Sequence, residues 1–375
     1  MSVGLYIHVP FCRTRCHFCA FYLRIYRHDK ATAYLESLRR EIRLHASLNS
    51  LGGQCPGTLY FGGGTPTTLS PDQLDAIVAQ VRTYFGLQEG AEITLEAHPD
   101  TVTKEELKRL VKTGFNRISF GAQSMDEDEL IQIGRRTSAE ATSKAVDMAR
   151  TAGFSNINLD LIYGLPEQTM ESWIATLNET LTLEPTHLSC YALTVEEDTR
   201  LAVDLRRGDR PEPDALLQNE MEDEAALRLT NAGFLRYEIS NYCRPGYVCR
   251  HNLLYWQGGE YLGLGPSAQS YVGGTRFGNV EDLAAYQKAL EKGQLPTGER
   301  EKLSRRQRQR EALVFGLRLT EGVDLQALGE EPQDRDWKET LHRLTRQGLL
   351  EKRSSRIKLT DLGRRYADSV AVSLL

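Results

Sequence analysis

Strand-like and helix-like segments alternate through the first 233 residues of this chain. Short apolar runs, such as residues 5–9 and 157–162, are each followed by a longer stretch with helical periodicity. Six such units follow one another. A succession of strand-then-helix units predicts a parallel sheet with helical crossovers. Six units fit a partial TIM-type barrel, (β/α)6, better than a dinucleotide-binding fold.

Polar residues and glycines follow the predicted strands at the point where each one ends. The first strand leads into three cysteines at residues 12–19, the second into Gly-Gly-Gly-Thr-Pro at 62–66, and the third into Glu96. The other three strands end in similar residues. Because barrel proteins build their sites at the carboxyl ends of the strands, we expect these residues to surround one cavity.

The cysteine cluster has the spacing C-x3-C-x2-C, formed by Cys12, Cys16 and Cys19. Three cysteines are a poor disulfide framework, because one thiol is always left over. Three thiolates can instead hold three irons of a [4Fe–4S] cluster and leave the fourth iron open to an outside ligand. We therefore predict a [4Fe–4S] cluster at these residues.

Composition limits the compartment and the partners. The chain has seven cysteines, an odd number, and its N-terminus carries no cleavable signal, so we expect a reducing, cytoplasmic location. No apolar run is long enough to cross a bilayer. The net charge of −5 gives no basic field, and the arginine-rich run at 305–310 is typical of a solvated helix face. We therefore expect no nucleic-acid partner.

The pattern changes after residue 233. Residues 237–242 are predicted to form one more strand, followed by an irregular Gly-rich stretch to about residue 279. Residues 304–375 then show a helix, a second helix, a β-ribbon and a last helix, which is a winged-helix-like order. The predicted division is a core barrel at 1–235, a connecting region at 236–297 and a small α+β domain at 298–375.

The cysteine cluster and the residues at the strand ends resemble the radical S-adenosylmethionine (radical SAM) superfamily. The resemblance extends to Gly134-Arg135 and to residues 160–169, Asp-Leu-Ile-Tyr-Gly-Leu-Pro-Glu-Gln-Thr. Within this superfamily, these motifs resemble the oxygen-independent coproporphyrinogen III oxidase, or HemN-like, branch. Within that branch, two features of the sequence resemble the heme chaperone family HemW most. Phe21 stands where the oxidases carry a fourth cysteine, and residues 251–256 match the H-N-x-x-Y-W motif of HemW proteins.

The resemblance implies that the amino and carboxylate groups of SAM fill the open iron position. The residue types at the implied SAM contacts suit this ligand. Glycines let the backbone approach closely, carboxylates accept hydrogen bonds from an ammonium group or ribose hydroxyls, and an arginine can pair with a carboxylate. The implied contacts are Tyr6, Phe18, Gly63, Gly64, Thr65, Glu96, Gln123, Arg135, Asp160 and Ala192.

The same resemblance implies that His251, Asn252, Tyr255 and Trp256 contact heme. A neutral imidazole is a common axial ligand of heme iron, and Asn252 would orient the ring of His251. Tyr255 and Trp256 offer flat faces for a porphyrin edge. We expect His251 to contact heme, and its direct ligation of the iron stays open. Without the family pattern, the segment would be a surface histidine followed by two core aromatics.

Four positions depart from the HemW pattern. Ala20 stands where an acidic residue is usual, and His98 replaces an asparagine. Thr137 and Gln269 stand where histidines are common. The two missing histidines remove alternative heme ligands or contacts to the heme propionates.

Two functions follow from the resemblance. In the first, the chain is a non-enzymatic heme chaperone that binds a [4Fe–4S] cluster with SAM and passes heme to an acceptor protein, such as a membrane respiratory enzyme. In the second, it is a radical SAM enzyme, either a coproporphyrinogen III oxidase or a methyltransferase, and a donor such as flavodoxin or ferredoxin reduces the cluster so that SAM is cleaved. Phe21 argues against the oxidase, and residues 251–256 favour the chaperone.

Overall fold

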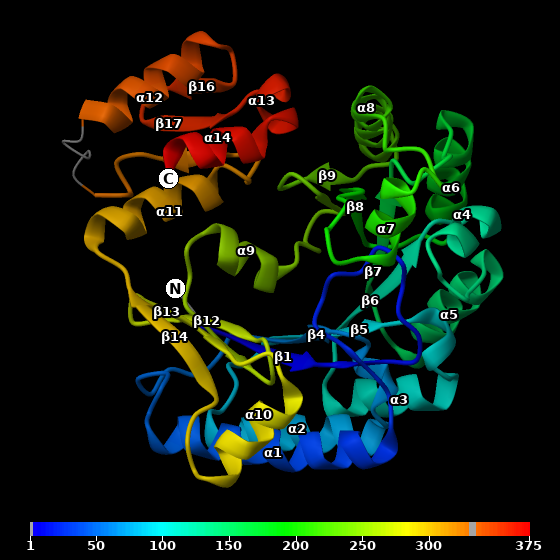
Figure 1. Cartoon of the computed structure of the whole chain (residues 1–375), viewed down its shortest axis with the longest axis vertical. Helices are drawn as coiled ribbons and strands as arrows, with labels where there is room; N and C mark the ends of the chain where they lie inside the picture. The colour runs from blue at the N-terminus through cyan, green and yellow to red at the C-terminus, as the bar shows by residue number, and fades with distance from the viewer. Residues whose placement is uncertain (1–2, 330–334) are drawn as a thin grey trace.

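The structure is a computed structural model that describes residues 3–329 and 335–375 (Figure 1). Within these residues a 12-stranded sheet forms the centre of the molecule. Six of its strands are parallel neighbours in chain order, which confirms the predicted (β/α)6 partial barrel. They are β1 (Gly4–Val9), β4 (Thr58–Gly63), β5 (Glu92–Ala97), β6 (Arg117–Gln123), β7 (Asn156–Tyr163) and β8 (His187–Ala192).

Helices follow these strands and cover the outer face of the sheet (Figure 1). Several begin at capping boxes, such as Ser70 with Gln73 and Thr103 with Glu106, in which side chains satisfy the first free N–H groups of the helix. The main crossover helices are α1 (His28–Ser47), α2 (Pro71–Tyr84), α3 (Lys104–Thr113), α5 (Ala139–Ala152), α6 (Met170–Thr182) and α8 (Ala215–Asn231).

Alternation along the strands separates an apolar outer face from a polar inner face. On β6, Ile118 and Phe120 are fully buried in the main hydrophobic core. Arg117, Ser119 and Gly121 instead line a cavity on the inner side. Because successive side chains of a strand point to opposite faces, the same strand supplies both the core and the site.

The sheet continues beyond β1, where the sequence suggested irregular structure. β11 (Tyr261–Leu264) pairs parallel with β1, and antiparallel strands β12 (Gln269–Val272), β13 (Thr275–Asn279) and β14 (Thr297–Lys302) follow. The expectation of an irregular stretch to residue 279 was therefore wrong. Four glycines and few apolar residues in 257–265 hide the strand, which depends on pairing with distant β1.

The prediction of one strand over residues 237–242 was wrong in its bounds. The described chain forms a short hairpin there, from β9 (Leu235–Arg236) to β10 (Asn241–Cys243), and β10 pairs antiparallel with β8. The N–H of Tyr237 donates to the carbonyl oxygen of Asn241 at 3.2 Å. This contact turns the chain back, so the hairpin closes the second edge of the parallel strands.

Glu41 on α1 ties the extension to the barrel. Its fully buried carboxylate accepts hydrogen bonds from the Tyr286 hydroxyl at 2.6 Å, the Asn279 amide at 2.5 Å and the Gly265 N–H at 2.8 Å. Tyr286 belongs to α10 (Leu283–Glu291). Burial raises the pKa of Glu41 to about 7, against the lowering effect of these three donors.

The short helix α9 (Arg250–Trp256) lies on the opposite side of the sheet from α1 and α2, between the sheet and the C-terminal helices (Figure 1). The Glu92 carboxylate accepts hydrogen bonds from the backbone N–H groups of Arg250 at 2.9 Å and His251 at 3.0 Å. A negative charge at the first turn stabilises a helix. Glu92 thus fixes α9 against the inner face of the barrel.

The C-terminal segments form a second hydrophobic core around Leu313, Trp337 and Ile357. Their helix, helix, ribbon order agrees with the predicted small α+β domain. β14 covers the predicted start of that domain at residue 298 and pairs with β13, so we propose a boundary after Lys302. The elements are α11 (Arg305–Gly316), β15 (Val323–Asp324), α12 (Arg335–Arg346), β16 (Leu350–Arg353), β17 (Arg356–Leu359), α13 (Asp361–Arg365) and α14 (Ala367–Leu374).

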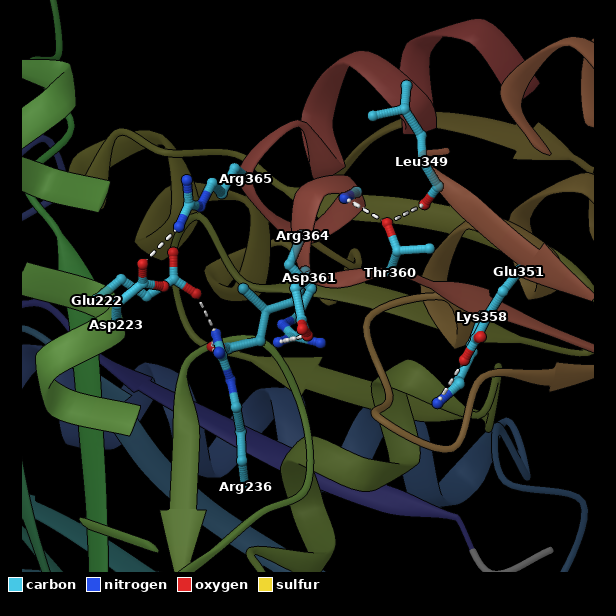
Figure 2. A network of polar contacts seen from close by, with 12 residues as sticks. Glu222, Asp223, Arg236, Leu349, Glu351, Lys358, Thr360, Asp361, Arg364 and Arg365 are labelled. Carbon is cyan, nitrogen blue, oxygen red and sulfur yellow. Dashed lines mark hydrogen bonds and ion pairs between the residues drawn. The ribbon is translucent and has the colours of Figure 1, made fainter. Parts of the chain in front are cut away.

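Ion pairs connect the small domain to the barrel. Figure 2 shows Arg365 of α13 reaching Asp223 of α8 at 2.5 Å, beside the pair of Arg236 with Glu222 at 2.5 Å.

Among the described helices, none has both the length and the apolar character that crossing a membrane requires.

Candidate metal-cluster and ligand site

A cavity of about 660 Å³ opens at the carboxyl ends of the parallel strands. The three clustered cysteines stand on one side of it, and residues from β4 to β8 and their loops form the rest. Nine of the ten residues expected to contact SAM line this cavity: Phe18, Gly63, Gly64, Thr65, Glu96, Gln123, Arg135, Asp160 and Ala192.

The cysteines lie on the loop that follows β1. Cys12 ends β2 (Phe11–Cys12), which pairs with β3 (Arg24–Ile25) and so closes the loop at its base. The Sγ atom of Cys12 lies 3.3 Å from the Thr65 hydroxyl, and that of Cys16 lies 3.8 Å from the Arg135 guanidinium. All seven cysteines are free, and the three in this loop are half-buried.

The three thiols of this loop do not meet at a single metal position. Within the residues that the structure describes, no three side chains of His, Cys, Asp or Glu converge on a point that could hold one metal ion. In a [4Fe–4S] cluster each thiolate binds a different iron, so convergence is not required. Burial raises the pKa of the Cys12 thiol to about 11 and also raises that of Cys19. Iron binding must therefore displace protons from this loop.

The loop after β4 packs tightly against the cysteine segment. The Thr65 N–H donates to the Phe11 carbonyl oxygen at 2.7 Å. Gly63 has φ of +104°, and a Cβ atom there would lie 2.6 Å from the His8 ring. A Cβ atom on Gly64 would lie 2.6 Å from the Phe11 carbonyl oxygen. Glycine is therefore the residue that fits at 63 and at 64. Because neither glycine has a side chain, a ligand can approach the backbone of this loop closely.

A β-bulge directs Gln123 into the cavity, where it meets Arg135. The register between β6 and β7 shifts between Gly121 and Gln123, and Gln123 has φ of 71°. The Arg135 guanidinium donates a hydrogen bond to the Gly121 carbonyl oxygen. A bulge at the end of a strand re-aims the residue that follows it. Gln123 and Arg135 thus meet over Gly121 on the same side of the cavity as Cys16.

Two carboxylates face the cavity from neighbouring strands. Glu96 accepts a hydrogen bond from the Tyr60 hydroxyl at 2.8 Å. Asp160 accepts from the Ser119 hydroxyl and the Asn158 amide, both at 2.9 Å. Burial, and then the charge of Asp160, raises the pKa of Glu96 to about 7, and burial raises the pKa of Asp160. A cationic ligand would relieve the repulsion between them.

Tyr6, the tenth residue expected to contact SAM, is not among the described residues that line this cavity. Its ring packs behind Tyr60 at a centroid distance of 6.1 Å and against His251 at 6.4 Å. Tyr6 lines a second cavity of about 260 Å³, which lies between α9, β10 and the C-terminal domain.

His251 is an interior residue with both ring nitrogens engaged. It is 1% exposed. Nδ1 lies 2.8 Å from the Thr58 hydroxyl and Nε2 lies 2.8 Å from the Tyr255 hydroxyl. Burial, and then the positive charge of Arg117, lowers the pKa of His251 to about 3, so the ring is neutral. Binding iron would require His251 to give up one of these two contacts.

The expected role of Asn252 in orienting the His251 ring was wrong, because Thr58 and Tyr255 hold both ring nitrogens. Asn252 lines the main cavity and also the second one. Tyr255 and Trp256 line only the second. The Arg318 guanidinium stacks over the Trp256 ring at 4.4 Å. The buried Nε1 atom of Trp256 has no hydrogen-bond partner in the described part of the chain.

The inner floor of the main cavity holds residues that sequence reasoning missed, namely Arg117, Ser119, Asn158 and Ser189. The available signal was the alternation Arg-Ile-Ser-Phe-Gly-Ala-Gln in residues 117–123. It separates a polar face from an apolar one, but it does not show that the polar face points inward.

The four departures from the expected family pattern have different surroundings. His98 lines the main cavity, and burial lowers its pKa to about 3. Ala20 and Gln269 are exposed, and Thr137 lines an outer groove beside Arg135. Of the four, only His98 is among the described residues that line the main cavity.

Comparisons with known proteins match both parts of the chain. The model of the radical SAM superfamily matches residues 6–180, and that of the HemN C-terminal domain matches residues 303–366. Among solved structures, the coproporphyrinogen III oxidase HemN of Escherichia coli, a radical SAM enzyme, superposes with a TM-score of 0.86. It is 26% identical, and the match covers 100% of this chain and 90% of that one.

Curated relatives are similar along nearly their whole length. The heme chaperone HemW of Mycobacterium tuberculosis is 36% identical over 99% of this chain and 94% of its own. HemW of Bacillus subtilis is 32% identical, with 97% of each chain covered. The mitochondrial radical S-adenosyl methionine domain-containing protein 1 of Mus musculus is 34% identical over 99% of this chain and 87% of its own.

Proposed function

Since this chain belongs to the HemW family of radical SAM proteins, we propose that it is a heme chaperone: it binds a [4Fe–4S] cluster and SAM, and it passes heme to an acceptor protein. The observation that carries this proposal is the likeness to heme chaperones along nearly the whole chain. The cavity supports it, because three cysteines and a set of polar side chains, among them Glu96, Asp160 and Arg135, line it together.

Cys12, Cys16 and Cys19 would hold the cluster through their thiolates. A bound [4Fe–4S] cluster supplies one-electron chemistry and one open coordination position. Arg135, close to Cys16, places a positive charge beside the thiolates. Thr65 lies against Cys12 and orients its sulfur. These contacts support a fixed geometry for the loop.

The polar groups around the cavity would hold SAM next to the cysteines. Glu96 and Asp160 would accept hydrogen bonds from its ammonium or ribose groups, and Arg135 would pair with its carboxylate. Gly63 and Gly64 would allow close backbone approach. Tyr6 would act only indirectly, by supporting Tyr60. The remaining proposed contacts are Phe18, Thr65, Gln123 and Ala192.

Heme would lie at the second cavity, against Tyr255 and Trp256, with Asn252 in the wall that this cavity shares with the main one. The flat indole of Trp256 and its free N–H support contact with a porphyrin edge. His251 would act as a positioning residue that holds Tyr255 through its Nε2 atom. We propose that His251 does not ligate the iron.

The proposed partners are a heme acceptor, such as a membrane respiratory enzyme, and a cytoplasmic electron donor of the flavodoxin or ferredoxin type if SAM is cleaved. Arg13 and Arg15 are exposed beside the cysteines and would suit an acidic donor. The free state of all seven cysteines supports a reducing compartment.

A radical SAM enzyme is the second candidate, and the structural similarity to HemN favours it. A coproporphyrinogen oxidase would decarboxylate propionate side chains, and a methyltransferase would transfer a methyl group. Phe21, 67% exposed near the cysteine loop, occupies the position of the fourth cysteine in the oxidases. This substitution speaks against the oxidase and leaves the methyltransferase open.

One experiment separates the candidates. The cluster is reconstituted without oxygen, heme is titrated into the protein, and the loaded protein is mixed with an acceptor apoprotein. Reduced protein with SAM and coproporphyrinogen III is assayed in parallel. The chaperone proposal expects stoichiometric heme binding, heme transfer and no protoporphyrinogen IX. Trp256→Ala should bind heme about tenfold more weakly, whereas Tyr84→Ala on α2 should bind normally. Product formation, or no heme binding, would contradict the proposal.

A further inference from the structure

Arg117 is a buried cation without a close partner. Its side chain is 2% exposed, and it lines the inner floor of the main cavity. The Nε atom is buried and lacks a hydrogen-bond partner. Among residues 3–329 and 335–375, its guanidinium group forms neither a hydrogen bond nor an ion pair. Burial opposes the charge of Arg117, but Cys249, Glu92 and other nearby groups raise its pKa, so the guanidinium stays a cation. What it lacks is an acceptor, and a buried N–H group without one is unfavourable, so this arrangement indicates a site for an accepting oxyanion.

The nearby carboxylates do not fill this role, because each has donors of its own. Glu92 accepts hydrogen bonds from the N–H groups at the start of α9. Asp160 accepts from Ser119 and Asn158, and Glu96 accepts from Tyr60. The other groups near Arg117 are the thiol of Cys249 and the hydroxyls of Tyr60 and Tyr237, which are ordinarily neutral.

The chemistry of the floor is that of a carboxylate site. A guanidinium presents a planar fork of N–H groups that matches a carboxylate in a bidentate manner. The hydroxyls of Ser119 and Ser189 line the same floor, but each already donates its hydrogen bond, to Asp160 and to Asn158. The N–H groups of Arg117 are therefore the donors that an oxyanion would meet there. The cavity gives such a ligand room to enter.

The main cavity is adjacent to the second cavity beside α9. Tyr60, Glu96, Tyr191 and Asn252 line both cavities, so one layer of side chains separates them. A molecule lying against Tyr255 and Trp256 could therefore extend a carboxylate arm past Asn252 toward Arg117. Heme carries two propionate arms on one edge.

We propose that Arg117 binds a propionate of heme whose porphyrin lies against α9. The inference rests on the proposed heme-binding function and adds the group that recognises the acidic edge of the ligand. It also assigns the inner floor to heme and the cysteine side of the same cavity to SAM.

The test compares heme with its dimethyl ester, in which both propionates are uncharged. Wild type should bind the ester about tenfold to a hundredfold more weakly than heme, as expected for a charge-assisted contact. In Arg117→Met the ratio of the two affinities should fall close to one, and Arg117→Lys should keep part of it. Because the ratio is taken within one protein, it does not depend on the folded fraction. Arg136→Met, at the exposed rim of the same cavity, should keep the wild-type ratio.

The outcomes are distinct. Equal binding of both ligands by wild type, or an unchanged ratio in Arg117→Met, would overturn this inference and leave the proposed heme binding intact. If Arg136→Met, and not Arg117→Met, lost the preference for heme over its dimethyl ester, the anion site would lie at the rim of the cavity. That result would also overturn this inference. Weaker SAM binding by Arg117→Met with an unchanged ratio would assign the arginine to SAM. Failure of wild type to bind either porphyrin would overturn the proposed function as well.

Discussion

The Nδ1 atom of His251 lies 2.8 Å from the hydroxyl oxygen of Thr58, a residue 193 positions away in the chain. This contact joins α9 to the beginning of β4. Together with the bond from Nε2 to Tyr255, it makes the histidine part of the barrel interior. A residue that resembles a heme ligand in the sequence therefore has a packing role that mutagenesis must separate from ligand binding.

His251→Ala is expected to lower the free energy of unfolding by ~2–4 kcal/mol. The change opens a cavity and leaves the hydroxyls of Thr58 and Tyr255 without their partner. Urea unfolding of the protein without heme measures the effect. Asn252→Ala, which alters a cavity-lining side chain beside it, should cost less than ~1 kcal/mol. Equal stabilities of wild type and His251→Ala would refute the packing role.

Gly63→Ala is expected to destabilise the chain by ~2–4 kcal/mol, because its Cβ atom would lie 2.6 Å from the His8 ring. The ring has little freedom to move, since its Nε2 atom lies 3.0 Å from the Tyr22 carbonyl oxygen. Gly90→Ala is the matched control, with φ of +67° and no atom within 4 Å, and should cost ~1 kcal/mol. Similar losses in the two variants would mean that backbone strain alone matters at Gly63.

Glu41 should make stability depend on pH. Burial raises its pKa from 4.5 to about 7, so between these values the folded chain holds a proton that the unfolded chain has released. Stability therefore falls as the pH rises through this window, by ~3 kcal/mol at most. Glu41→Gln cannot ionise and should show a smaller fall, which leaves the share of Glu96, whose pKa burial also raises to about 7, whereas Glu36→Gln on the exposed side of α1 should keep the full fall. Urea unfolding at about pH 5 and about pH 8 decides. A fall of the same size in wild type and Glu41→Gln would exclude Glu41 as the titrating group.

Asp160→Asn is expected to weaken SAM binding about tenfold to a hundredfold by removing a charged acceptor from the cavity. Equilibrium binding of SAM to the reconstituted protein measures the change. Asp147→Asn on the exposed face of α5 should leave the affinity unchanged. If Asp160→Asn bound SAM as wild type does, the proposed arrangement of SAM along β7 would be wrong.

The sequence was sufficient to predict the parallel strands and the grouping of their ends around one cavity. Alternating apolar runs define each strand locally, and the topology of βα units then brings the strand ends together. β11 could not be predicted in the same way. Its residues follow Gly258 and Gly259, and its strand character comes from pairing with β1, a contact between distant parts of the chain.

The orientation of individual side chains was the other limit. Nothing local to residues 251–256 indicates that the His251 ring points toward Thr58, because that contact exists only after the barrel forms. Arg117 was missed for the same reason. A charged residue in an alternating strand usually faces solvent, and only the closed curvature of the barrel turns this one inward.

The binding of a cluster by Cys12, Cys16 and Cys19 is the central claim, and iron analysis of the anaerobically reconstituted protein tests it most directly. We expect about four irons per chain and the visible absorption of a [4Fe–4S] cluster in wild type, and almost no iron when the three cysteines are replaced by serine. Replacing Cys55, which is exposed outside the loop, should change neither value. A wild-type protein without iron, or equal iron content in wild type and the serine variant, would contradict the account.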